Sequence, residues 1–295
     1  MFVAFTMDVD PDANRAVEGR PDAVTAGGEG GVRMDGCREG LEWIAEIMEQ
    51  TGLPCTFFWE TRTLLHLSES DPDLLDRLRD NTGFEHACHG LRHEDFSGKV
   101  SGQPLDADAT RDTVEEAIQG FQKVFGERPE GFRAPYCRLT DDLISTLAET
   151  GFRYDASRTV ELQKSIDLMP SHLTRKPRTL WEIPLCRWRD SEGQPISGYL
   201  WQLMEGRRTE DDYLTMLGEI ADSYRTVLVQ VALHPWHLRV RADGQRLSNQ
   251  ETRANREKLG SIIWGLLRMD GLHFSRVGNY LDGLSGECRS CVERG

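Results

Sequence analysis

The segment Val227–Leu233 restricts the fold more than any other part of this chain. It reads Val-Leu-Val-Gln-Val-Ala-Leu, so both faces of the strand that it predicts are almost entirely apolar. A strand of this kind is covered on both sides, which is typical of parallel sheets flanked by helices. The run Phe2–Val9 has the same character. We therefore predict a parallel α/β sheet or barrel.

Strand and helix patterns alternate along the rest of the chain. Further strands are expected at Cys55–Trp59, Phe84–Cys88, Gly131–Arg133, Phe152–Asp155, Leu180–Leu185 and Leu272–Phe274. Helical spacing of apolar residues predicts helices over Cys37–Gln50, Pro72–Asp80, Asp106–Phe125, Asp141–Glu149, Glu210–Tyr224 and Asn249–Met269. This alternation supports the same α/β class.

A long polar and glycine-rich stretch, Pro11–Gly36, follows the first strand. Loops of this length are uncommon in compact domains and are often functional, so a lid over the strand ends and a disordered excursion both stay open. No linker divides the chain. We expect a single catalytic domain in residues 1–282 and a loose C-terminal tail in residues 283–295.

The formal net charge of −14 limits the partners that the chain can have. An acidic surface repels nucleic acid and anionic membranes, so we expect neither as a partner. No apolar run reaches membrane-spanning length, and the first residues show no signal peptide. The seven cysteines are scattered and odd in number, as in a reduced set of thiols. These features predict a cytoplasmic protein, and leave open whether it forms a homo-oligomer.

Polar residues suited to catalysis or metal binding gather at the predicted carboxyl ends of the strands, where α/β folds bind their ligands. These residues are Asp8, Asp10, His89, His93, Arg133, Asp155 and His234. Because such strand ends meet at one edge of a parallel sheet, we predict that these residues form one active site.

Asp10, His89 and His93 form the predicted metal set. Two histidines four residues apart share one face if the backbone is helical there. One carboxylate with two imidazoles suits a divalent ion and leaves positions open for water and substrate. Two unrelated surface histidines, or a Ca²⁺ loop beginning at Asp8, would explain parts of the pattern, although Pro11 counts against the loop. We expect Zn²⁺ first, with Co²⁺, Ni²⁺ and Mn²⁺ as alternatives.

The remaining strand-end residues are suited to proton transfer. Asp8 and Asp10 point the same way in a regular strand, so a metal on Asp10 leaves Asp8 as a general base. Arg133 is placed to pair with Asp8 and to keep it charged. Asp155 and His234 would form an oriented acid–base pair. A capping aspartate and a loop histidine are the plainer alternatives for these two.

Two aromatic residues complete the predicted site. Pro135 makes its segment rigid, and the Tyr136 backbone N–H becomes a candidate donor to an oxyanion. Trp236 lies beside His234 and is expected to line a pocket, with core packing as the alternative. The chain has neither a G-x-S-x-G elbow nor a phosphate-binding glycine motif. A serine hydrolase and a nucleotide-dependent enzyme are therefore disfavoured.

Five motifs in a fixed order resemble the polysaccharide deacetylase family, the NodB-homology domain of carbohydrate esterase family four. They are Asp8-x-Asp10, His89-Gly90-x-x-His93, Arg133-x-Pro135-Tyr136, Asp155-x-Ser157 and Leu233-His234-Pro235. The Asp-x-Asp form and Glu94 after the second motif are more similar to an intracellular branch with peptidoglycan deacetylases and cyclic imidases. Val160 replaces an aromatic residue that the family pattern expects.

The resemblance implies a distorted (β/α) barrel with about seven repeats, fewer than the usual eight. It also implies a role for each motif residue. Asp8 would be the catalytic base and His234 the general acid, Arg133 and Asp155 would tune them, Tyr136 would stabilise the oxyanion, and Asp10, His89 and His93 would bind the metal.

The implied reaction is removal of an acyl group, acetyl first, from the nitrogen of an amino sugar or a sugar-containing metabolite. The substrate would thus be a saccharide or small molecule. One alternative is a metal-dependent hydrolase of a small cyclic or linear amide. Another is a non-catalytic sugar-binding protein on the same fold, which would have no need of a base and an acid.

Overall fold

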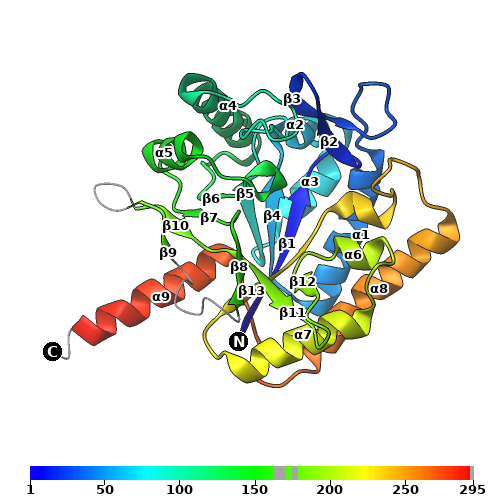
Figure 1. Cartoon of the computed structure of the whole chain (residues 1–295), viewed down its shortest axis with the longest axis vertical. Helices are drawn as coiled ribbons and strands as arrows, with labels where there is room; N and C mark the ends of the chain where they lie inside the picture. Colours follow the sequence, from blue (N-terminus) through cyan, green and yellow to red (C-terminus); the bar gives the residue numbers. More distant parts are fainter. Residues whose placement is uncertain (163–170, 175–178, 293–295) are drawn as a thin grey trace.

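The computed structural model describes residues 1–162, 171–174 and 179–292, with side chains up to residue 284. A nine-stranded sheet forms its centre (Figure 1). The strand order along the sheet is β13 (Leu228–Leu233), β1 (Phe2–Val9), β4 (Cys55–Trp59), β5 (Phe84–Cys88), β6 (Gly131–Phe132), β7 (Tyr154–Asp155), β10 (Trp181–Glu182) and β9 (Ser171–His172), with β14 (His273–Phe274) beside β1.

The central strands are parallel and buried, as their apolar faces require. All residues of β13 and nearly all of β1 are buried, and Phe5 lies opposite Val231 in the parallel register. Only the β9–β10 pair is antiparallel among the described strands of this sheet. The sheet curls into an incomplete barrel, which confirms the predicted fold class.

Helices cover the outside of the curled sheet (Figure 1). They are α1 (Asp35–Thr51), α2 (Thr61–Ser70), α3 (Pro72–Asp80), α4 (Ala107–Phe125), α5 (Asp141–Thr150), α6 (Trp201–Met204), α7 (Glu210–Ser223), α8 (Asn249–Leu267) and α9 (Val277–Val292). Their ends follow local signals: Gly52 and Gly126 end α1 and α4 in the left-handed conformation, and Ser248 caps α8 through a capping box.

The predicted strand Leu180–Leu185 is in fact two strands in different sheets. Its first part is β10, and its second part begins β11 (Leu185–Arg189), which pairs with β8 (Thr159–Glu161) and β12 (Pro195–Ser197). Pro184 stands between the two parts and has no N–H to donate, so a single strand is interrupted there. The resulting three-stranded sheet lies beside the strand ends of the main sheet.

The stretch Pro11–Gly36 is ordered, so the disordered excursion is wrong, and a lid over the strand ends stays a prediction. It forms the hairpin β2 (Asn14–Val17) and β3 (Arg20–Thr25), with Gly19 at a positive φ of 75° in the turn. The backbone of the hairpin donates and accepts hydrogen bonds with residues 92, 95 and 101. The hairpin is thus fixed against the loop that carries the predicted metal ligand His93.

The segment that we expected to be a loose tail, residues 283–295, mostly continues a helix. The helix α9 runs through Val277–Val292, and Val277, Tyr280 and Leu281 bury its first turns against the domain. Once these turns are formed, each added residue extends the helix at little cost. The domain boundary at residue 282 stays a prediction.

In the described ranges, no helix is both long and apolar enough for a membrane span. The described cysteines, Cys37, Cys55, Cys88, Cys137 and Cys186, are free thiols, as a reduced set predicts. The cytoplasmic location, the oligomeric state and the absence of a nucleic-acid partner stay predictions.

Candidate active site

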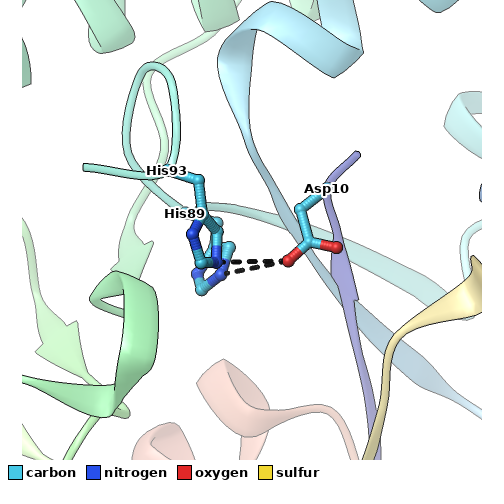
Figure 2. A group of neighbouring side chains, drawn as sticks. All are labelled: Asp10, His89 and His93. Carbon is cyan, nitrogen blue, oxygen red and sulfur yellow. Dashed lines mark ion pairs between the residues drawn. The ribbon is translucent and has the colours of Figure 1, made fainter. Parts of the chain in front are cut away.

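The three predicted metal ligands lie together at the carboxyl ends of β1 and β5. The Asp10 Oδ2 atom is 3.3 Å from His93 Nε2 and 3.8 Å from His89 Nε2, and all three side chains are buried. One potential ligand atom from each residue falls within 4.8 Å of the others. Figure 2 shows both imidazoles facing the same carboxylate oxygen.

The hydrogen bonds around this cluster leave the atoms that a metal would need without partners. His89 Nδ1 is 2.7 Å from the Arg133 carbonyl oxygen and donates to it, so Nε2 carries the lone pair. Trp236 Nε1 donates to Asp10 Oδ1 at 2.9 Å. The buried Asp10 Oδ2 and His89 Nε2 have no hydrogen-bond partner in the described residues. Partners on the far side of each ligand are typical of metal sites, so the residues fit a divalent ion.

Burial also shifts the pKa values of two of these ligands. It raises the pKa of Asp10 to about 6, although His234 and His89 act in the opposite direction. Burial lowers the pKa of His93 to about 3. A bound cation would favour the ionised form of Asp10, which burial opposes. His93 is already neutral, and a neutral imidazole is the form that binds a metal.

The two histidines do not share a helix face, which corrects the reasoning from their spacing. Residues 89–93 form a non-helical loop, with positive φ angles of 84° at Gly90 and 55° at His93. The Glu94 carboxylate accepts two backbone N–H groups of this loop. The loop therefore folds back on itself and brings the ring centroids of His89 and His93 within 5.0 Å.

The expected pairing of Asp8 with Arg133 is present and fully buried. Arg133 Nη1 donates to Asp8 Oδ1 at 2.6 Å, and the Tyr199 hydroxyl donates to Asp8 Oδ2. Burial acts to raise the pKa of Asp8, but Arg133, two nearby imidazoles and the Tyr199 hydrogen bond together hold it well below its usual range. Asp8 is therefore a carboxylate at neutral pH.

Arg133 is held by acceptors on every side. It donates to Thr6 Oγ1 at 3.2 Å, to the Ala156 carbonyl oxygen at 3.1 Å and to Gln230 Oε1. Gln230 is fixed in turn, because its amide donates to the Ile183 carbonyl oxygen at 2.7 Å. This network sets the direction of the guanidinium that faces Asp8.

Tyr199 is a site residue that the sequence did not reveal. Its hydroxyl lies 3.0 Å from His234 Nε2 and also contacts Asp8, so it bridges the two residues predicted to be base and acid. Its single proton goes to Asp8, which can only accept; His234 therefore donates from Nε2 to the tyrosine oxygen. Tyr199 reaches this place because its backbone pairs with Ala232 at the end of β13. No motif marks that contact in the sequence.

His234 lies at the end of β13, with Nε2 at 3.5 Å from Asp10 Oδ2. Burial lowers its pKa, and the carboxylates of Asp10 and Asp8 act in the opposite direction. The predicted pair between His234 and Asp155 does not form. Asp155 instead accepts from the backbone N–H and the hydroxyl of Ser157 at 2.9 and 2.7 Å.

Through Ser157, Asp155 is linked by hydrogen bonds to Ala134, the residue after Arg133, and not to His234. The Ser157 hydroxyl that it holds accepts the Ala134 N–H at 2.7 Å. Asp155 turns back onto its own chain because the residue two positions later offers both donors, a local pattern common for aspartate. Burial raises its pKa, and Glu182 is its carboxylate neighbour.

Tyr136 and Trp236 line a cavity of about 340 Å³ in front of these residues. Tyr136 has a positive φ of 58°, and its ring packs edge-on against His93 with centroids 4.6 Å apart. Its backbone N–H has no acceptor among the described hydrogen bonds. Trp236 is among the residues that line this cavity, and its part in substrate binding stays a prediction. The cavity also reaches Asn14 of the hairpin and the three-stranded sheet.

Comparison with known proteins finds similar sequences and similar folds. Residues 35–154 match the family model for polysaccharide deacetylase. A peptidoglycan deacetylase-like protein from Gibberella zeae is 32% identical over 120 residues, which is 41% of this chain. The match spans 33% of that relative's length. The branch within the family stays a prediction.

Two solved structures show the fold. A Mycobacterium smegmatis protein assigned to the polysaccharide deacetylases is 20% identical, with a TM-score of 0.64 over 97% of this chain and 90% of that one. An allantoinase is 18% identical, with a TM-score of 0.64 over 95% of this chain and 88% of that one. At these identities the likeness extends to the fold alone.

Proposed function

We propose that this chain, which matches the polysaccharide deacetylase model over residues 35–154, is a metal-dependent hydrolase of an N-acyl group. The acyl group would be acetyl, and the substrate an amino sugar or a sugar-containing metabolite. One observation carries the proposal: an ionised Asp8, a cluster suited to a metal and the Tyr199–His234 pair face one cavity. A protein that only binds sugar needs no such set.

Asp10, His89 and His93 would hold the ion, with Zn²⁺ as the first candidate. When bound, a divalent ion polarises the acyl carbonyl and makes water more acidic. The chain supports this set from behind, because Trp236 and the Arg133 carbonyl fix Asp10 and His89 through hydrogen bonds. Such outer partners orient ligands and raise affinity.

Asp8 would act as the general base. It lies in β1, two residues before Asp10, and the contact with Arg133 keeps it ionised beside the cavity. It accepts the proton of the attacking water. The Tyr136 N–H then donates to the oxygen that gains negative charge at the acyl carbon.

His234 would be the general acid that protonates the departing nitrogen. His234 lines the cavity beside two carboxylates, and their charges partly oppose the lowering of its pKa by burial. After the reaction Asp8 holds a proton and His234 lacks one. The Tyr199 hydroxyl contacts both, so it accepts the proton of Asp8 and donates its own to His234 Nε2, which restores the starting state.

A small cyclic or linear amide is the second candidate substrate. The cavity of about 340 Å³ lies at the lower end of the range for small-molecule sites, roughly 300–1,000 Å³. It therefore suits one ring better than several sugar units. An allantoinase also has this fold, which makes allantoin a suitable member of a substrate panel.

The test is hydrolysis of N-acetylated sugars, measured as released acetate, and of cyclic amides, measured as loss of the ring compound and gain of its ring-opened acid. Each reaction is run with the protein as purified, with a chelator, and after Zn²⁺ is restored to the chelated protein. We expect turnover of an N-acetylated sugar that the chelator abolishes and Zn²⁺ restores. Turnover that ignores the chelator would contradict the metal-dependent mechanism, and turnover of cyclic amides alone would favour the second candidate.

A further inference from the structure

The three-stranded sheet β12–β11–β8 forms one wall of the active-site cavity. Leu185 and Arg187 lie two residues apart in β11, so their side chains share a face, and both line the cavity. In the pairing register Thr159 of β8 lies opposite Leu185, and Ser197 of β12 lies opposite Arg187. Both of these hydroxyl residues also line the cavity. The wall therefore presents a guanidinium and two hydroxyl groups to the space in front of Asp8.

Arg187 differs from the buried Arg133 because its guanidinium is exposed at the cavity and no described protein group pairs with it. In the described part of the chain it makes no hydrogen bond or ion pair, and it is the sole lysine or arginine among the described residues that line the cavity. Glu161, its partner in the β8 register, is engaged by Arg189 Nε at 2.5 Å. The buried Arg133, by contrast, already has Asp8.

A guanidinium that faces a ligand cavity without a partner is suited to an anionic group. Its planar fork matches a carboxylate or a phosphate, and neighbouring hydroxyls add donors to the same oxygens. The overall charge of −14 opposes the entry of anions. An isolated cation in the cavity of so acidic a protein is therefore informative about the ligand.

We propose that the substrate carries an anionic substituent, a carboxylate or a phosphate, which Arg187 binds while the N-acyl group lies at the Asp10 end. This inference rests on the proposed function, because that function places the N-acyl group. It narrows the substrate class to small acidic N-acyl compounds. Ser197 and Thr159 contribute hydroxyl donors to the same subsite.

The test compares three probes that share one N-acetylated ring: N-acetylglucosamine, its 6-phosphate and N-acetylmuramic acid. Binding to the full chain is measured by calorimetry, and deacetylation by acetate release. We expect the wild type to bind one of the two anionic probes about 10–100-fold more tightly than the neutral sugar, the gain typical of hydrogen bonds to charged groups. The preferred anionic probe tells phosphate from carboxylate.

The variants separate the anion subsite from the rest of the site. Arg187→Met should remove the preference for the anionic probe, and Arg187→Lys should keep part of it because the charge remains without the fork. Arg253→Met, on a side chain that is 82% exposed in α8, is the matched control and should keep the full preference.

The results also distinguish the two proposals. Equal binding of neutral and anionic probes by the wild type, or a preference that survives in Arg187→Met, would overturn the anion subsite even if acetate is released. Binding that depends on Arg187 without acetate release from any probe would support the subsite and count against the deacetylase function.

Discussion

Replacement of Arg133 by methionine isolates the buried ion pair on which the site depends. The change keeps an unbranched side chain of similar length but removes the charge and all donors. Asp8 would stay buried without its cation. Among the described residues, the Tyr199 hydroxyl would be its remaining side-chain hydrogen-bond donor. Gln230 and the Ala156 carbonyl would each lose a donor.

The expected loss of stability follows from these contacts. Breaking a buried ion pair on one side costs about 3–5 kcal/mol, because a charge remains without compensation. Domains of this kind unfold at about 5–15 kcal/mol, so the variant should fold with a reduced margin. In an Asp8→Asn background no charge is stranded, and the same Arg133→Met change should cost less by about 2–3 kcal/mol.

The loss of stability in Arg133→Met should depend on pH, because it depends on the charge of Asp8. In the wild type the pKa of Asp8 is held below its usual value, so its contribution to stability is present above the unfolded pKa and lost as the pH falls through the folded pKa. Without Arg133, burial should raise the pKa of Asp8. The folded protein would then be more stable when Asp8 is protonated. The loss in free energy of unfolding caused by Arg133→Met should therefore become smaller as the pH falls from 7 to 5.

Urea unfolding of the four proteins in this cycle, at both pH values, measures each quantity. If Arg133→Met unfolds within about 1 kcal/mol of the wild type at pH 7, the ion pair does not stabilise the fold as described. If the loss is the same with and without Asp8, the ion pair is not its source.

Three further changes test other parts of the structure. Trp236→Phe removes the hydrogen bond to Asp10, so we expect Zn²⁺ binding about 10–100-fold weaker in competition with a chelator. Gly40→Ala would place a Cβ atom 1.9 Å from the Pro235 carbonyl oxygen, and urea unfolding should show a loss of about 1–3 kcal/mol. Burial lowers the pKa of His86 from 6.5 to about 4, so the wild type should lose stability as the pH falls through this interval; His86→Phe should move the acid unfolding midpoint to lower pH.

The central sheet and the main site residues were predictable because burial and parallel topology act through simple patterns. Apolar residues on both faces identified β1 and β13, which are indeed buried neighbours. The carboxyl ends of parallel strands meet at one edge, and this geometry brings Asp8, Asp10 and His89 together. The pairing of Asp8 with Arg133 followed from the same edge.

The details that failed depend on contacts between segments that have no common pattern. The loop between His89 and His93 is shaped by Glu94, not by helical periodicity. Asp155 binds Ser157 because the residue two positions later offers both a backbone and a hydroxyl donor. Tyr199 reaches the site through a single backbone bridge to β13, and such a bridge leaves no periodic signal in the sequence.

The central claim is that Asp8 acts as the base beside an ion held by Asp10, His89 and His93. The most direct measurement is Zn²⁺ content and acetate release, in the same samples, for the wild type and for Asp8→Asn. We predict equal Zn²⁺ content and a loss of activity of about 10²–10⁴-fold, because only the proton acceptor is removed. Full turnover by an Asp8→Asn sample with its Zn²⁺ bound would contradict the account.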